Sequence, residues 1–135
     1  MIPLNPYGGH DLDFDNRRTV IDTLHAIGPG AMAAVPTLVR IAQEPQEHVM
    51  ERGNAIRALG AIGDRSVVPQ LIPVLRDSDP GLAREAGLTI ERLAHCDFPH
   101  DDGHTWQNDA GQAVIAVAVL AWWDAEGQSM DWEHP

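Results

Sequence analysis

The chain has 135 residues, which suits one domain, and its 44% apolar content is ordinary for a folded protein. Its formal net charge is −11 and all nine basic residues are arginines, which excludes the basic face needed for nucleic acid and the lysine of Schiff-base or P-loop chemistry. One cysteine cannot form an internal disulfide, no apolar run is long enough to span a membrane, and the first fifteen residues lack a signal peptide's pattern. We therefore expect a cytoplasmic protein with neither a nucleic-acid nor a membrane partner.

The predicted elements are helices that recur along the chain. LHAIG at 24–28 matches LGAIG at 59–63 at an offset of 35 residues, and VPTL at 35–38 matches VPQL at 68–71 at an offset of 33. The slip of two residues lies in the turn between helices, where insertions are tolerated. A period of this length indicates a helical repeat array, in which each unit packs against its neighbours.

Each unit is predicted to contain two helices, each with one apolar face, because apolar residues recur three and four positions apart. Gly28 and Gly63 are expected to end the first helix of their units, at a position where the backbone takes a positive φ. Pro36 and Pro69 fall near the start of the second helices, where a missing N–H does little harm. Pro73 lies deeper in its helix and is expected to kink it.

The segment RALGAIGDRSVVPQLIPVLRDSDPGLAREA resembles the short HEAT repeats of phycobilisome-lyase-like bacterial proteins. It shares their ALGxIGD turn, their VPxLIxxL second helix and their DxDP turn between repeats. The resemblance implies an all-α fold, a right-handed α-solenoid of about three helix pairs. The expected repeats are at about 17–44, 49–77 and 82–126, within a single domain at 1–135.

The third pair departs from the pattern. A loop insertion at 95–107 follows its first helix, and we expect Phe98 and Trp106 in that loop to pack over the end of the core. The final helix is predicted from about Asn108 to Glu126, with Asn108 or Asp109 as its N-cap, followed by a tail at 127–135.

The final helix contains AVIAVAVLAWW at 113–123, eleven residues without a polar side chain, which predicts burial on more than one side. One possibility is a monomer in which the loop, residues Pro3 to Tyr7 and a tail anchored by Trp122 or Trp123 cover the helix. The other is a homodimer through this C-terminal helix.

The inserted loop raises the question of a metal site. Cys96, His100 and His104 are spaced by four residues and could bind a zinc or iron ion. The segment lacks a CxxC or HxxxE framework, however, and Pro99 and Gly103 favour a polar connection. We therefore expect no metal and no cofactor. No serine or cysteine lies in a nucleophile motif, so no catalytic residue is assigned.

The function that remains after these exclusions is that of a non-enzymatic scaffold or adaptor, which binds a protein on the concave face of the solenoid. The 43 residues after Arg92 contain eight acids and no base, which favours a basic partner. An immunity-like inhibitor that masks a basic enzyme is the alternative, followed by a metal-binding or bilin-lyase-related protein. The residues expected to contact the partner are Thr37, Arg40, Gln70, Arg76, Trp122 and Trp123.

Overall fold

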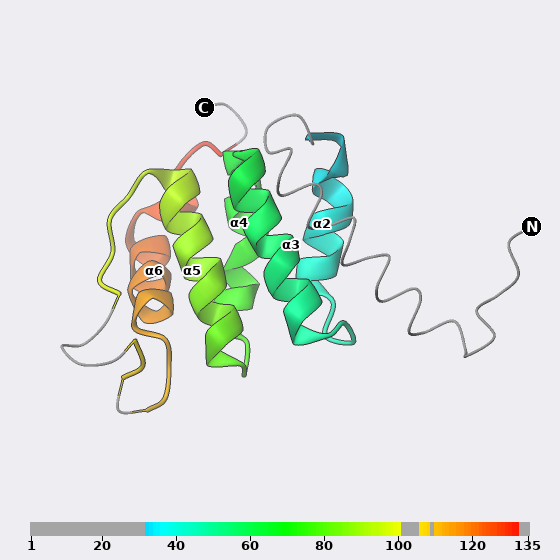
Figure 1. The fold of residues 1–135 in the computed structure, drawn as a ribbon. Coiled ribbons are helices and arrows are strands. Elements are labelled where there is room, and N and C mark those ends of the chain that lie inside the picture. The colour runs from blue at the N-terminus through cyan, green and yellow to red at the C-terminus, as the bar shows by residue number, and fades with distance from the viewer. Residues whose placement is uncertain (1–31, 101–105, 109, 133–135) are drawn as a thin grey trace, which may run out of the picture.

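The computed structural model describes residues 32–100, 106–108 and 110–132 (Figure 1). The helices are α2 (Val35–Gln43), α3 (Val49–Ile62), α4 (Val68–Leu71), α5 (Pro80–Ala94) and α6 (Val114–Ala125), with the 3₁₀ helices η2 (Arg65–Val67), η3 (Ile72–Arg76) and η4 (Gly127–Ser129). Apart from one isolated bridge between Gln107 and Ala113, all regular structure in these residues is helical. The predicted all-α solenoid is confirmed. None of the described helices has the length and apolar character needed to cross a membrane.

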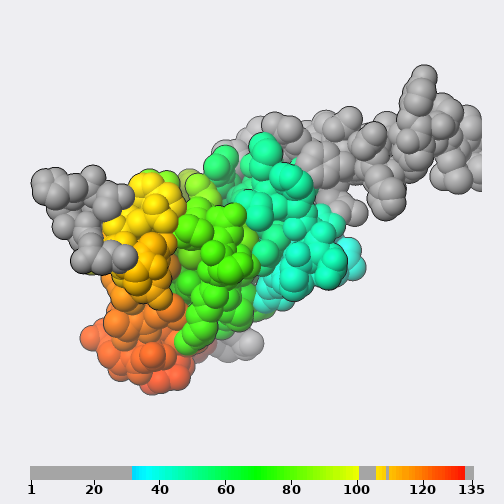
Figure 2. All heavy atoms as spheres, turned by 90° about the horizontal axis from the view of Figure 1, so that it is seen from below, coloured from blue at the N-terminus to red at the C-terminus, as the bar shows by residue number. Residues whose placement is uncertain are grey.

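The helices form two layers. First helices α3 and α5 pack side by side, and α4 with η3 lies behind them (Figure 1). α2 packs against α3 at one end, and α6 packs against α5 at the other. The colours in Figure 2 run in order along the molecule, from cyan through green to orange. Each helix pair therefore contacts mainly the adjacent pairs, as in other helical repeat arrays.

Gly63 ends α3 as predicted. Its φ is +87°, a conformation that glycine adopts without the steric penalty of a Cβ, and its N–H donates to the Leu59 carbonyl. Asp64 then caps η2 by accepting hydrogen bonds from the backbone N–H and the hydroxyl of Ser66, at 3.0 and 2.6 Å. Gly28, the equivalent residue of the preceding unit, lies outside the described residues.

The prolines act as expected on the second helices. Pro36 and Pro69 are the second residues of α2 and α4, where their rings fit the first turn. Pro73 has no N–H to donate to the carbonyl four residues earlier, and the backbone tightens from α4 into the 3₁₀ helix η3 at Ile72. The structure thus shows a change of helix type at this proline, and the kink itself stays a prediction.

The last helix begins later than predicted. α6 begins at Val114 with Ala113 as its N-cap, so neither Asn108 nor Asp109 caps it. The Asn108 side-chain oxygen instead accepts hydrogen bonds from the N–H groups of Ala110 and Gln112, at 2.9 and 3.0 Å. An asparagine can close a tight turn as readily as it can cap a helix, and here the Asn108 side chain closes the turn that precedes α6.

One hydrophobic core joins the helices. Gly87 of α5 lets α6 approach closely, because a Cβ at this position would lie 3.0 Å from the Ile115 side chain. Burying each large aliphatic side chain contributes roughly 1.5–3 kcal/mol relative to exposure. The large apolar side chains that are fully buried come from all five α-helices and from η2: Leu38, Ile56, Leu59, Val67, Val68, Leu71, Leu82, Ile90, Ile115 and Val119.

The tail folds back on α6, as predicted for a helix with apolar residues on every side. Trp132 is buried, its ring stacks on Trp123 and meets Trp122 edge-on, and its indole N–H donates to the Gly127 carbonyl at 2.8 Å. The Arg65 guanidinium lies over the same ring, 4.8 Å from its centroid. Val117 on α6 stays 42% exposed. Residues Pro3 to Tyr7 lie outside the described residues, and the choice between monomer and homodimer stays a prediction.

Candidate protein-binding surface

Four of the six residues predicted to contact a partner lie exposed on second helices: Thr37 and Arg40 on α2, Gln70 on α4 and Arg76 on η3. Thr37 and Arg40 are three residues apart and so share one face of α2. The Gln43 side chain donates to the Gln70 carbonyl at 2.7 Å and links α2 to α4. The exposed side of α2, α4, η3 and α6 is called the second-helix face below.

A groove of about 520 Å³ opens beside Arg76 on this face. One wall is the turn from η3 into α5, and the other is the first half of α6 with the residues just before it (Figure 2, green and orange). Apolar side chains line much of it, among them Leu75, Ala116, Val117 and Leu120. The sequence indicated Arg76 but not this groove, because its two walls come from segments that are far apart in the chain.

Trp122 and Trp123, the other two predicted contacts, are half-buried within the chain. Trp122 lies 5.5 Å from the Phe98 ring and 5.9 Å from Trp132, and Trp123 lies 6.2 Å from Trp132, measured between ring centroids. Gly127 faces both indoles, so that a Cβ there would approach each to 2.8 Å. These contacts give the two indoles a structural role in anchoring the tail, and their contact with a partner stays a prediction.

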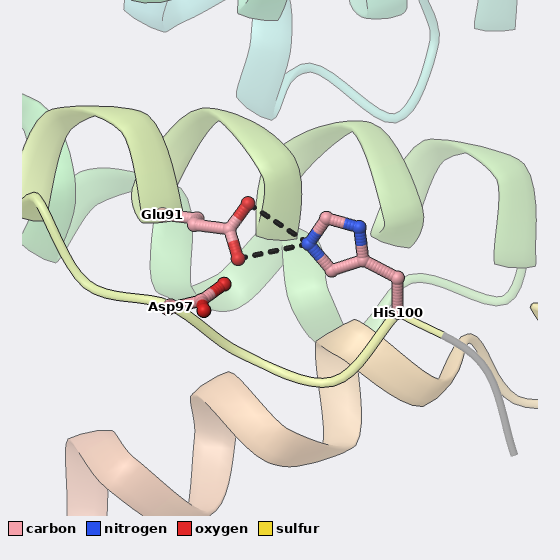
Figure 3. A group of neighbouring side chains, drawn as sticks. All are labelled: Glu91, Asp97 and His100. Carbon is pink, nitrogen blue, oxygen red and sulfur yellow. Dashed lines mark hydrogen bonds and ion pairs between the residues drawn. The ribbon is translucent and has the colours of Figure 1, made fainter.

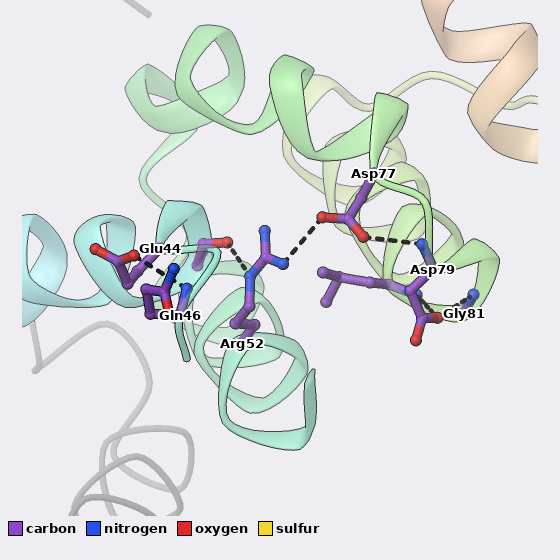
Figure 4. A network of polar contacts seen from close by, with 8 residues as sticks. Glu44, Gln46, Arg52, Asp77, Asp79 and Gly81 are labelled. Atoms are coloured by element: carbon purple, nitrogen blue, oxygen red, sulfur yellow. Dashed lines mark hydrogen bonds and ion pairs between the residues drawn. The ribbon is translucent and has the colours of Figure 1, made fainter. Parts of the chain in front are cut away.

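A buried arginine holds the groove's rim in place (Figure 4). Arg52 of α3 is 7% exposed; its Nε donates to the Ala42 carbonyl at 3.0 Å, and its Nη1 pairs with Asp77 at 2.9 Å. The other Asp77 oxygen accepts the N–H of Asp79, which in turn caps α5. This network joins the end of α2, α3 and the turn that carries Arg76. Arg52 and Asp77 are 25 residues apart, and the sequence pattern singled out neither for this contact.

The inserted loop brings together a different set of polar residues from the one predicted. His100 meets Glu91 of α5 and Asp97 (Figure 3). Cys96 does not join them; its thiol lies 3.6 Å from the Ala94 carbonyl. His104, the third residue of the predicted set, lies outside the described residues. Phe98 and Trp106 pack against the core as expected, and Arg84 lies over the Trp106 ring at 5.7 Å.

Comparison with known proteins agrees with this architecture. The family model for HEAT repeats matches residues 9–89, which is more than half of the chain. Comparisons with the curated proteins and with the solved structures gave no match. The phycobilisome-lyase-like subtype stays a prediction. The paired helices, the glycine turn at Gly63 and the matched family model together place the chain in the HEAT-repeat family.

Proposed function

We propose that the chain is a non-enzymatic adaptor that binds a protein partner on its second-helix face. HEAT repeats generally serve as protein-interaction scaffolds, since a stack of helix pairs offers an extended surface that side chains can adapt to a partner. Within that general role, Arg40 and Arg76 are the proposed charged contacts, and Thr37 and Gln70 are the proposed polar contacts between them.

The observation that carries the proposal is the groove beside Arg76. Its lining is part apolar and part polar, Val117 stands 42% exposed in it, and an exposed arginine lies at its rim. A partner side chain of leucine size that filled the groove would gain about 1.5–3 kcal/mol from burial. An exposed arginine–carboxylate pair adds only about 0–1 kcal/mol. The groove would therefore supply affinity, and Arg76 and Arg40 would select partners with a carboxylate next to an apolar residue.

The acidic C-terminal flank supports a second candidate, the inhibitor of a basic enzyme. Asp97, Asp124, Glu126 and Asp131 are all exposed, in a chain of net charge −11. Charges of one sign gathered on a surface accelerate association with a partner of opposite sign. In the adaptor this flank would steer a basic partner toward the groove; in an inhibitor it would itself be the contact surface.

The test is affinity capture from the native host with the full chain as bait, followed by mass spectrometry and by binding measurements with the partner identified. The double variant Arg40→Glu, Arg76→Glu should weaken partner binding at least tenfold, with little change in melting temperature because both side chains are exposed. The matched control, Arg57→Glu with Arg92→Glu, makes the same charge change at exposed positions of the first helices and should bind normally.

Unchanged binding by the Arg40, Arg76 variant would contradict the adaptor proposal for this face. If Asp124→Asn with Glu126→Gln then abolished binding, the acidic flank would be the contact surface. That result would favour the inhibitor.

A further inference from the structure

We propose that Glu91, Asp97 and His100 form a binding site for a divalent transition metal ion of the zinc type. Each of the three residues offers one ligand atom, and these atoms all lie within 4.8 Å of one another. Glu91 comes from the last turns of α5, and the other two come from the segment that follows the helix. The site is separate from the second-helix face, so it does not depend on the proposed adaptor function.

The three side chains point into one space between α5 and the loop (Figure 3). Both carboxylate oxygens of Glu91 face the same imidazole nitrogen, with His100 Nε2 at 2.9 Å from Oε1 and 2.8 Å from Oε2. Ligand bonds to zinc of about 2.0–2.2 Å put the ligands of a tetrahedral ion roughly 3.3 Å apart. An ion could therefore replace the hydrogen bond between Glu91 and His100 with side-chain shifts of about 1 Å.

Contacts independent of any ion hold Glu91 and the backbone of the loop beside it in position. The Glu91 side chain is only 18% exposed, and its Oε2 also accepts the Phe98 N–H at 2.8 Å. The Phe98 ring packs edge-on against Trp122 of α6. His95 turns the chain at the end of α5 with a φ of +57°, which directs the following residues back along the helix. A site whose ligands are already fixed by surrounding contacts loses less entropy when an ion binds.

The ligand types select the metal. An imidazole nitrogen beside two carboxylates suits zinc, cobalt or nickel, whereas calcium and magnesium prefer oxygen ligands alone. Three protein ligands leave a fourth tetrahedral position for water, and the His100 side chain, 47% exposed, leaves solvent access to it. A bound ion would join the loop to α5 more firmly than the hydrogen bond does.

The test uses the full chain without a histidine tag, stripped of metal with a chelator and titrated with Zn²⁺ by calorimetry. We expect one ion per chain with a dissociation constant in the micromolar range, and an intense visible spectrum when Co²⁺ is used as the probe. Glu91→Gln should weaken Zn²⁺ binding at least tenfold while keeping the fold, because the glutamine oxygen can still accept the Phe98 N–H. His100→Gln should weaken it to a similar extent.

Two controls distinguish this site from general attraction of cations to the acidic surface and from a site that uses the thiol. Glu91→Gln with Asp97→Asn and Asp124→Asn with Glu126→Gln each remove two negative charges, but only the first pair should abolish stoichiometric binding. Cys96→Ser should bind Zn²⁺ as the natural chain does. The proposal is overturned by a dissociation constant above 1 mM, by equal losses in the two charge-matched pairs, or by loss of binding in Cys96→Ser.

Discussion

Replacing Asp77 with asparagine would remove the negative charge opposite Arg52 while keeping the size of the side chain. Breaking a fully buried ion pair in this way typically costs about 3–5 kcal/mol. The cost here should be smaller, because the Asp77 side chain is 19% exposed and Arg52 keeps its bond to the Ala42 carbonyl. We expect Asp77→Asn to lower the free energy of unfolding by about 2–3 kcal/mol, which corresponds to a fall in melting temperature of roughly 6–15 °C for a chain of this size.

The reciprocal change should be milder. Arg52→Met keeps most of the aliphatic stem in the core, and the Asp77 carboxylate it leaves behind still accepts the Asp79 N–H. We expect a loss of about 1–2 kcal/mol for this variant, and a coupling of about 1–2 kcal/mol when the two changes are combined. Urea denaturation of the natural chain, the two single variants and the double variant measures all these terms.

The exposed pair between Arg57 and Glu85 provides the control. Its arginine side chain is 57% exposed, so Arg57→Met should change stability by less than about 1 kcal/mol. A coupling between Arg52 and Asp77 below about 0.5 kcal/mol would refute the reasoning, since the pair would then contribute no more than one on the surface.

The remaining predictions concern the turn at Gly63, the tail, the groove and the metal site. Gly63→Val should destabilise the fold by at least about 1 kcal/mol, because valine is strained at a φ of +87°; a melting temperature equal to that of the natural chain would contradict this. Trp132→Ala should cost about 2–3 kcal/mol by thermal denaturation, below the usual range for a buried tryptophan because the tail can detach without collapse of the core. Charge reversal at Arg40 and Arg76 should weaken partner capture relative to the Arg57, Arg92 control, and Glu91→Gln should weaken Zn²⁺ binding where Cys96→Ser does not.

Features that depend on local backbone chemistry could be predicted from the sequence. Gly63 is one, because a helix that ends in a left-handed residue favours glycine whatever the tertiary context. The prolines are further local features of this type. Pro36 and Pro69 mark the first turns of α2 and α4, and Pro73 lies where the backbone tightens into η3. The fold class could be predicted from the sequence repeat, since matched turns at a fixed period constrain how the helices stack.

Features that depend on distant residues could not be predicted in the same way. Glu91 is nine residues before His100 and lies in a helix, so the spacing within the loop offers only Cys96, His100 and His104 as candidate ligands and favours a loop without a metal. Asn108 closes a turn where the sequence predicts a helix cap, because its side chain can accept the same kind of hydrogen bond in a turn and at the start of a helix.

Trp132 contacts Trp122, Trp123 and Arg65, and these contacts have a consequence for how this chain could change in evolution. Repeat arrays commonly lengthen by duplication of a unit. Residues 127–132 fold back on α6 and reach the turn of the preceding helix pair through Arg65. Trp132 lies at the edge of the array that the turns form, beside Arg65, Arg92 and His95. A duplicated unit inserted between these two helix pairs would move Trp132 away from Arg65 and break this contact.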